Sequence, residues 1–597
     1  MLFSSLFAKT AEYEKLAHAL SAPGACALFG LPGSGRAMVY AALAKETGRF
    51  LCIVTPGEAE ATRFAGDLNA LGIPTAVFPA RDYVLRPIEG TAREYEYRRL
   101  SVLGDIVGGR LQAVCVPDEG LTQYTTPRAE FCNNTRTLHP GDTVPRTELT
   151  ALLYNAGYAR RAQVDGPGQF SIRGDIVDLY APDMKLPVRM EFWGDEIDTM
   201  HTFDLATQRR EDPIEKIYVS PAREVLFGSP AEAAELLRAF IKKFRGKKRT
   251  ALEACLATEL AQLDGGALPV NMDKYLAVRY PQPATLLDYF DDPLLVLEEP
   301  ASLREAERAT TYRRGEEISA LLQDGVLAAG LDNLYAENGY LWAQAANHRT
   351  ICAENFARSM PDIPLKDIVN APAHTLPAWG GEVTSLLEDL QPLCNGGAAV
   401  TVLAGTQRAA AGLAADLRTK GLLVTTDPDA APGAGLVQVL PGQLSAGCSV
   451  PFAKYALFTA RAFGISSTQK KKKRNKDALN SLSEIAVGDL VVHQNHGIGR
   501  YAGIQRMAVQ GVTKDYLRIE YDKKDVLYVP VTQLDLLSRY TAPNDSDNVK
   551  LSRLGGSDWA KTRKKVKAAT EQMAKELIEL YARRKQAKGH AFPPDDT

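Results

Sequence analysis

The sequence predicts an α/β protein of several domains: a parallel-sheet core with an inserted antiparallel β module, a second small α/β domain, a small β-barrel and a long helix. The chain has 597 residues, which at about 150 residues per domain corresponds to roughly four domains. Short apolar runs alternate with helical stretches at 1–125 and 370–465, the pattern of strands joined by crossover helices. At 126–212 and 485–540, short strands follow one another without helices.

The composition is that of a globular protein. Apolar residues make up 45% and charged residues 24% of the chain, and 70 Lys and Arg nearly balance 72 Asp and Glu, which argues against a disordered chain. No apolar run approaches the roughly 18 residues of a membrane helix, and the N-terminus lacks the pattern of a signal peptide. We therefore expect a cytoplasmic protein without a membrane partner.

The residues that could bind metals are few and scattered. The eight cysteines are spread along the chain, with no two within four residues of each other, which argues against a disulfide framework or a Cys-rich zinc site. His493 and His496 lie three residues apart near a turn, with no Cys or carboxylate nearby to complete a ligand set. We expect no metal site.

The parallel-sheet core is expected in two parts, at 1–125 and 213–350. In the first part, predicted strands alternate with predicted helices. The strands are 25–29, 50–54, 75–78 and 111–116, and the helices are 36–46, 58–71 and 91–107. The second part contributes helices at 231–244, 251–263 and 302–322 and a buried strand at 294–297.

The β module is expected at 126–212, between the two parts of the core. Its predicted strands are 162–164, 169–172, 176–180, 188–192 and 196–201. The first two are joined by a Gly-Pro-Gly turn, and Gly194-Asp195 forms a hairpin turn between the last two.

Three further segments follow the small α/β domain at 370–465. A polar linker at 466–483 contains the basic block 470–474, which is either a solvated tether or a contact to DNA phosphates. The small barrel is expected at 484–545. A helix capped by Ser557 lies within 549–597, and its basic face has the same ambiguity.

A glycine-rich loop at the end of the first strand resembles a phosphate-binding loop but lacks its functional side chains. Gly30, Gly33 and Gly35 lie between a strand and a helix, where backbone N–H groups can cradle phosphates. Arg36 replaces the lysine that contacts the terminal phosphates, and Ala37 replaces the hydroxyl that binds Mg²⁺. We predict a degenerate, inactive nucleotide site with no catalytic residue.

A second motif supports the same prediction. The strand 294–297 leads into Glu298-Glu299-Pro300-Ala301, where a helicase-type core would carry Asp-Glu-x-His. Glu298 and Glu299 therefore form a degenerate acidic motif. The glycines are then expected to allow close packing of the helix on the sheet.

Specific stretches of the chain resemble one family together. Residues 157–180 and 189–198 resemble the β module of the excision-repair protein UvrB, with the sequences GYARRAQVDGPGQFSIRGDIVDLY and RMEFWGDEID. Residues 487–503 and 527–531, VGDLVVHQNHGIGRYAG and LYVPV, resemble the polymerase-interacting domain of CarD-type proteins. Residues 554–559 and 580–584 resemble the helix that joins this domain to a motor in the Mfd family.

A UvrB-like half followed by a CarD-like domain is the order of the Mfd family of bacterial transcription-repair coupling factors. The resemblance implies a degenerate RecA/UvrB-like core, a Tudor/SH3-like barrel, binding of UvrA and of the β subunit of RNA polymerase, and, in the whole family protein, ATP-dependent translocation on double-stranded DNA. No motor motif follows Tyr540. We therefore expect an N-terminal fragment that is a scaffold, with ATP and Mg²⁺ belonging to the motor of the family.

The resemblance assigns the UvrA-binding surface to Arg173, Arg189 and Trp193. Two guanidiniums and an exposed aromatic ring make a reasonable binding hot spot. The structural alternative is that the arginines pair with Asp178 and Glu191 inside the module while the tryptophan packs on the hairpin.

The resemblance assigns polymerase binding to an edge strand at 514–521, centred on Leu517, Arg518 and Ile519. An added strand would supply main-chain hydrogen bonds. The structural alternative is a core strand with only Arg518 solvated.

Two other functions remain open. A UvrB-like ATP-dependent helicase conflicts with Arg36, Ala37 and the acidic motif, and UvrB's Tyr-rich hairpin has no counterpart between Asp82 and Glu94. A CarD-like transcription regulator would explain only about 55 residues. Whether this chain has an enzymatic activity of its own is left open by the sequence. In the family, ATP hydrolysis is expected of the helicase-like motor, which this chain lacks.

Overall fold

The computed structural model describes residues 10–86, 93–205, 207–360, 363–460, 487–493, 497–509, 512–522, 525–530, 537–539 and 551–552. The chain divides into two compact units, 1–463 and 464–597. Each unit is described by itself. Among the described residues, no helix is long and apolar enough to span a membrane.

The core of the first unit is a seven-stranded sheet in the order β15-β1-β14-β13-β2-β4-β3, in which every neighbouring pair is parallel. The strands are β1 (Gly24–Phe29), β2 (Leu51–Thr55), β3 (Thr75–Val77), β4 (Ala113–Pro117), β13 (Leu294–Glu298), β14 (Arg349–Glu354) and β15 (Leu365–Asn370). The predicted parallel sheet is confirmed. Because β13 and β14 lie between β1 and β2, the two sequence halves form one sheet.

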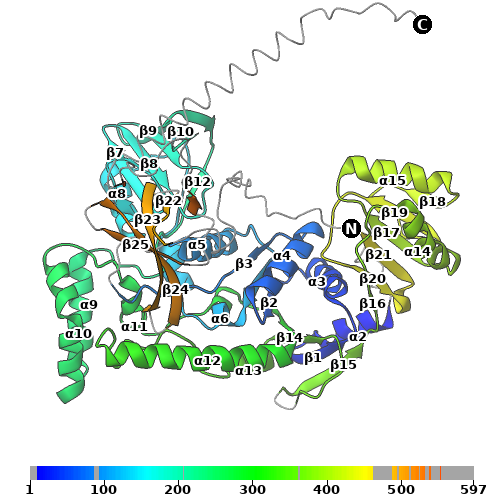
Figure 1. Cartoon of the computed structure of the whole chain (residues 1–597), viewed down its shortest axis with the longest axis horizontal. Coiled ribbons are helices and arrows are strands. Elements are labelled where there is room, and N and C mark those ends of the chain that lie inside the picture. Colours follow the sequence, from blue (N-terminus) through cyan, green and yellow to red (C-terminus); the bar gives the residue numbers. More distant parts are fainter. Residues whose placement is uncertain are drawn as a thin grey trace, which may run out of the picture. The chain divides into compact units, whose positions relative to one another are not determined.

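Helices cover both faces of this sheet (Figure 1). Alternate strand residues belong to two separate apolar clusters, one under each helical layer. On one face lie α2 (Ala11–Ala19), α3 (Gly33–Thr47) and α4 (Glu58–Ala70). On the other lie α5 (Glu94–Val107), α12 (Pro300–Gln323) and α13 (Tyr340–Asn347). Strands buried on both faces explain why their sequences are nearly continuous apolar runs.

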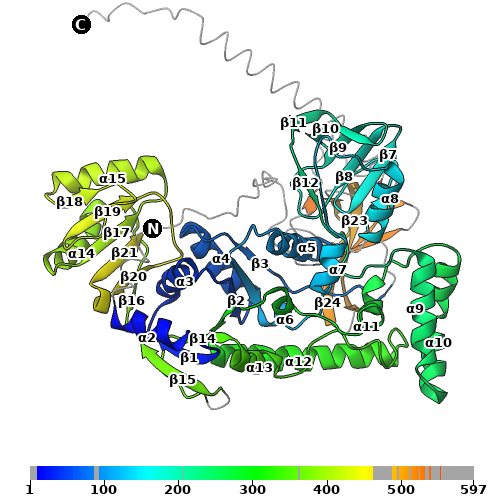
Figure 2. The ribbon, with the colours of Figure 1, turned by 180° about the vertical axis from the view of Figure 1, so that it is seen from behind.

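Between the β module and β13 the chain forms a helical subdomain. The helices α9 (Pro230–Lys242) and α10 (Gly246–Asp264) pair as a hairpin, followed by η1 (Met272–Tyr275), α11 (Leu276–Arg279) and η2 (Leu286–Tyr289). Their apolar faces form a third cluster with the end of α12. Figure 2 shows the hairpin at one end of this unit and the second α/β domain at the other.

The β module is a six-stranded sheet in the order β11-β10-β9-β8-β7-β6. The strands are β6 (Ala159–Arg160), β7 (Gln169–Arg173), β8 (Ile176–Tyr180), β9 (Val188–Trp193), β10 (Glu196–Phe203) and β11 (Arg210–Pro213). The strand expected at 162–164 lies instead at Ala159–Arg160. This strand, β6, pairs with β7 in parallel, and parallel neighbours cannot be joined by the tight hairpin turn that was expected here. The other pairs are antiparallel.

The module also contains elements that the sequence analysis missed. The helix α8 (Arg146–Asn155) packs on one face of the sheet. The helices α6 (Asp118–Leu121) and α7 (Arg128–Asn133) lead into it, and β5 (Arg136–Leu138) pairs with β12 (Ile217–Val219). This pairing brings the two ends of the module together, so both connections to the core lie at one place.

The second α/β domain has a six-stranded sheet in the order β16-β20-β21-β17-β19-β18. The strands are β16 (His374–Leu376), β17 (Ala399–Leu403), β18 (Leu423–Thr425), β19 (Leu436–Leu440), β20 (Gly447–Val450) and β21 (Tyr455–Thr459), flanked by α14 (Val383–Asn395) and α15 (Gln407–Thr419). The domain packs on the core, because the first apolar cluster contains residues of α3, β20 and β21 together.

In the second unit the described residues form one antiparallel sheet in the order β25-β24-β23-β22-β26. The strands are β22 (Leu490–His493), β23 (Gly497–Val509), β24 (Val512–Glu520), β25 (Val526–Pro530) and β26 (Leu537–Arg539). The linker at 466–483, with its basic block, lies outside the described residues, and so does nearly all of 549–597.

Candidate functional site

The glycine-rich loop lies where the sequence analysis expected it, between β1 and α3. Helix α3 begins at Gly33, and its N-cap residue Pro32 gives no side-chain cap. Gly30 has a φ of 90°, and a Cβ there would meet the backbone of Ala371 and Pro372 at 3.0 Å. A Cβ at Gly33 would clash with the guanidinium of Arg63. The backbone of Ala371 and Pro372 and the guanidinium of Arg63 therefore lie directly against the loop.

Arg36 connects the degenerate loop to the degenerate acidic motif. Its Nη1 lies 2.9 Å from Oε2 of Glu298, and its Nη2 lies 2.8 Å from Oε1 of Glu299. The same guanidinium donates hydrogen bonds to the carbonyl of Ala353 (3.1 Å) and to Oδ1 of Asn355 (3.4 Å). The two motifs that the sequence separates by over 260 residues therefore meet as an ion pair.

This ion pair is removed from water. The side chains of Arg36 and Glu298 are only 3% and 2% exposed. Burial by itself would lower the pKa of Arg36, but the neighbouring Glu298, Tyr40 and Glu299 raise it. Burial raises the pKa of Glu298, against the effects of Arg36 and of the Tyr40 hydroxyl, which donates to Oε1 at 2.6 Å. Arg36 and Glu298 therefore each oppose the other's loss of charge.

The second α/β domain covers the helix that follows the loop. Every residue of α3 from Ser34 to Ala44 is buried. In the adjoining α4, Asp67 accepts hydrogen bonds from the backbone N–H (2.7 Å) and hydroxyl (2.6 Å) of Ser445. A nucleotide of the kind held by phosphate loops does not fit these residues, because Arg36 is engaged and Ala37 offers no oxygen to a metal.

The β module presents a second arrangement of arginines and a carboxylate. Asp178, on β8, is fully buried and accepts from both Arg189 on β9 and Arg173 on β7. Arg189 forms two bonds, from Nε (2.7 Å) and Nη2 (2.9 Å), and Arg173 donates from Nη2 (2.7 Å). The hydrogen bond to Asp178 raises the pKa of Arg189. One buried carboxylate therefore orients two cations.

The three residues assigned to UvrA binding differ in exposure. The side chain of Arg189 is 12% exposed and that of Arg173 is 48% exposed. Trp193, at the end of β9, is 84% exposed, next to the turn at Gly194 with a φ of 65°. Cross-strand pairing places Arg189 opposite Asp178 on β8. The module brings a fixed guanidinium pair and an uncovered indole ring to the same sheet.

The structural alternative from the sequence is only half right. Both arginines do pair inside the module, but both choose Asp178. Glu191 pairs instead with Arg210 of β11 and accepts from the Thr199 hydroxyl. Trp193 does not pack on the hairpin. The sequence suggested Asp178 as a partner for one arginine. It could not show that both arginines donate to the same carboxylate.

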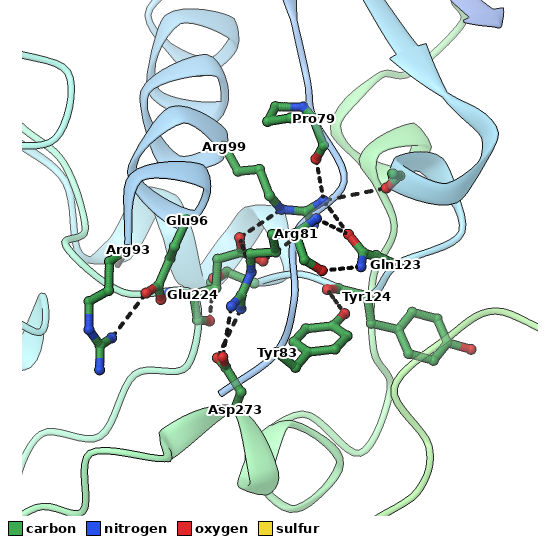
Figure 3. A network of polar contacts seen from close by, with 12 residues as sticks. Pro79, Arg81, Tyr83, Arg93, Glu96, Arg99, Gln123, Tyr124, Glu224 and Asp273 are labelled. Carbon is green, nitrogen blue, oxygen red and sulfur yellow. Dashed lines mark hydrogen bonds and ion pairs between the residues drawn. The ribbon is translucent and has the colours of Figure 1, made fainter. Parts of the chain in front are cut away.

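A buried polar network fixes the module to the core (Figure 3). Glu224, just after β12, accepts from Arg99 of α5 at 2.7 Å and lies 3.0 Å from Nε of Arg81. Arg81 in turn makes a bidentate pair with Asp273 of η1, at 2.7 and 2.9 Å. Arg99 and Glu224 are fully buried. The network joins the core, the exit of the module and the helical subdomain, so it sets the module's orientation.

The edge-strand assignment at 514–521 is wrong. Strand β24 lies between β23 and β25 and is hydrogen-bonded to both. Leu517 and Ile519 are fully buried, while the Arg518 side chain is 41% exposed and pairs with Glu520 at 2.8 Å. The edges of this sheet are β25 and β26. The alternation of apolar residues fixed which face is buried, but the neighbours of a strand depend on the order of strands in the sheet.

The described residues contain no group of three or more His, Cys, Asp or Glu side chains that could hold a metal. His493 is buried at the end of β22, and His496 lies outside the described residues. Burial raises the pKa of the Cys52 thiol to about 12, so this thiol is protonated and unreactive.

Comparison with known proteins identifies two regions. Residues 137–225 match the UvrB interaction domain, and residues 485–541 match the CarD-like/TRCF RID domain. The chain is 30% identical over 584 residues to a transcription-repair-coupling factor of Bacillus subtilis. It is 27% identical over 586 residues to the one of Staphylococcus haemolyticus. Each alignment covers 95% of this chain and 49% of the relative, so the chain spans about half the length of the curated relatives it matches.

Proposed function

We propose a scaffold function for this chain, which belongs to the Mfd family of transcription-repair-coupling factors. The chain binds UvrA through the face of the β module around Trp193. It binds the β subunit of RNA polymerase through the five-stranded sheet of the second unit, called here the small β domain. The single observation that carries the proposal is an exposed tryptophan on the same sheet as two oriented arginines, within the region similar to the UvrB interaction domain.

The UvrA surface has the features of a binding hot spot. An uncovered indole ring supplies a large apolar area that a partner can desolvate. Arg173 keeps part of its guanidinium in solvent while Asp178 holds its orientation, so a partner carboxylate would meet a donor that is already positioned. Arg189 is mostly buried and acts as a positioning residue for Asp178 and Arg173.

A pull-down with purified UvrA tests this surface. We expect Trp193→Ala to reduce UvrA retention strongly, because the ring is the largest exposed apolar group on the module. Tyr312→Ala is the matched control, since Tyr312 is 74% exposed on α12, outside the module. Equal UvrA retention by both variants would refute the assignment.

For polymerase binding, the edge strand β25 is the proposed docking strand, in place of β24. Its outer side has no neighbouring strand in the described sheet, so its main chain can accept an added strand. Tyr528, at its centre, is 37% exposed. The finer fold belongs to the same proposal: a small Tudor/SH3-like barrel at 484–545, continued by a connecting helix at 549–597.

Binding to the isolated β subunit tests the edge strand. We expect Tyr528→Asp to weaken binding, because it places a charge on the strand that must pair. Arg500→Ala, an exposed position on β23, should bind normally. UvrA binding should be unchanged in both variants. If Tyr528→Asp binds polymerase like the parent chain, β25 is not the docking strand.

We further propose that this chain's own loop does not turn over ATP, since Arg36 is committed to Glu298 and Glu299. DNA-stimulated phosphate release by the purified chain would favour the alternative of a UvrB-like helicase. In this proposal the family's ATP-driven translocation on double-stranded DNA is assigned to no residue of this chain.

A further inference from the structure

The tip of the α9–α10 hairpin concentrates positive charge in a way that neither proposed binding surface uses. Between Glu235 and Glu253 the sequence has seven Lys and Arg and no Asp or Glu. Six of these cations fall at the end of α9 and the start of α10. They are Lys242, Lys243, Arg245, Lys247, Lys248 and Arg249. We call these six residues the basic tip.

The basic tip is open to solvent and largely unpaired. All six residues are exposed. Arg249 pairs with Glu253 one turn along α10, at 2.8 Å. For the other five no ion pair with a described residue is found, so their charges are not neutralised within the part of the chain that the structure describes.

The basic tip also opposes the electrostatic preference of its own helix. The positive end of a helix dipole favours acidic residues in the first turn. In α10 the first turn has no acidic residue, and the N-cap residue Arg245 gives no side-chain cap to the free N–H groups. The cations Lys247, Lys248 and Arg249 add to this field instead of offsetting it. A bound anion would satisfy both the side chains and the helix end.

The hairpin that presents the basic tip is rigidly supported. Apolar residues of both helices, including Leu237, Ile241 and Leu252, are buried in one cluster. Lys274, itself buried, donates to Glu259 of α10 at 2.7 Å and to the carbonyl of Cys255 at 3.0 Å. The charges are therefore presented on a fixed element rather than a loose loop.

The chemistry of the basic tip favours one class of polyanion. Its only nearby aromatic rings, Phe240 and Phe244, are partly buried against the apolar cluster, so no exposed ring is available to stack on single-stranded bases. It likewise has no uncovered apolar anchor of the kind that dominates protein–protein hot spots. A compact group of Lys and Arg without such anchors suits closely spaced phosphates.

We propose that the basic tip of the α9–α10 hairpin binds the phosphate backbone of double-stranded DNA without sequence preference. This goes beyond the scaffold function, because it involves neither the β module nor the small β domain. The first unit would then contact DNA directly.

The test is the salt dependence of binding of the full chain to a fluorescently labelled mixed-sequence duplex. Lys247→Glu/Lys248→Glu is the variant, and its folding is protected because glutamates suit the first turn of a helix. Arg408→Glu/Lys420→Glu is the control, with the same charge change at exposed positions of the second α/β domain. The basic block 470–474 is present in every protein, so its contribution cancels.

We expect the tip variant to bind duplex about tenfold or more weakly at low salt, and its log–log salt slope to be less steep by about two, one unit for each lost phosphate contact. The control should match the parent chain. Identical affinity and slope for the tip variant and the control would overturn the proposal. Competition by poly-L-glutamate as strong as by duplex, at equal charge concentration, would assign the basic tip to an acidic polypeptide and overturn it too.

Discussion

Two regions of this chain use the same chemistry, arginine against carboxylate, in opposite ways. In the core, Arg36 is 3% exposed and connects the glycine-rich loop to Glu298 and Glu299. In the β module, Arg173 is 48% exposed and Asp178 holds it beside the solvent. The first arrangement keeps its guanidinium away from solvent, whereas the second leaves part of a guanidinium available.

The difference leads us to expect that exposure, not residue type, decides whether such a pair acts in folding or in binding. A buried ion pair contributes little net stability, but removal of one partner is costly because the other charge stays buried. An exposed pair contributes little in either direction. The core pair should therefore be sensitive to mutation in folding assays, and the module face in binding assays.

The largest expected effect on stability is that of Arg36→Ala. It leaves Glu298 buried without its cation, so the free energy of unfolding should fall by about 3–5 kcal/mol. Chemical denaturation of the parent chain and the variant measures this. The double variant Arg36→Met/Glu298→Leu, which removes both buried charges, should recover much of the loss. A loss below about 1 kcal/mol in the single variant would show that the pair does not hold the core together.

Asp118 extends the comparison to a buried carboxylate with no ion pair among the described residues. Burial first, and then the nearby Glu307, raises its pKa to about 7, while Arg314 opposes the rise. The folded state keeps the proton between about pH 4 and 7 while the unfolded state loses it. Its contribution to stability is thus complete below pH 4 and is lost as the pH rises to 7.

Between pH 5 and 7 this loss amounts to at most about 1.4 kcal/mol per pH unit. We expect Asp118→Asn to remove it, so the stability difference between the variant and the parent chain should shift with pH over that window. Equal pH profiles from denaturation at pH 5, 6 and 7 would contradict the raised pKa.

Arg189→Ala tests the module face at its more buried member. Asp178 would keep only Arg173, so we expect the unfolding free energy to fall by about 2 kcal/mol, less than for Arg36→Ala because one cation remains. UvrA binding should weaken as well, since Arg173 and Asp178 lose their alignment. A stability loss equal to that of Arg36→Ala would erase the distinction between the two regions.

The smallest stability effect is expected for Trp193→Ala. An 84% exposed side chain has little packing to lose, so the free energy of unfolding should change by no more than about 0.5 kcal/mol. The same variant should lose at least about 2 kcal/mol of UvrA binding, as a hot-spot residue does. Calorimetric titration measures the second value. A large stability loss with intact binding would reverse the roles of the two regions.

Much of the fold could be predicted from local patterns. The apolar runs at 25–29, 50–54 and 294–297 predicted strands that the structure contains, and the helix at 302–322 differs from α12 only at its ends. The central strand β14, the edge strand β15 and the helix α8 were missed. In β15 only Val369 is fully buried, so its sequence lacks the continuous apolar run of a central strand.

For the candidate site, the sequence indicated which residues to consider but not which side chains they contact. Arg36 and Glu298 were each recognised as substitutions, yet neither motif indicates that the arginine takes the glutamates as partners. Likewise the exposure of Trp193 and the sharing of Asp178 depend on which strands are neighbours. The assignment of 514–521 to a sheet edge failed for this reason.

The sequence alone determined the local elements, the loss of the lysine and hydroxyl from the loop, and the segments that resemble UvrB and CarD-type proteins. These depend on side-chain chemistry and spacing along the chain, which sequence records directly. Only the tertiary structure decided that Arg36 pairs with Glu298, that β24 is internal, and that five of the six cations of the basic tip form no ion pair with a described residue. These depend on contacts between residues far apart in the chain, and burial in such contacts sets what each charge can do.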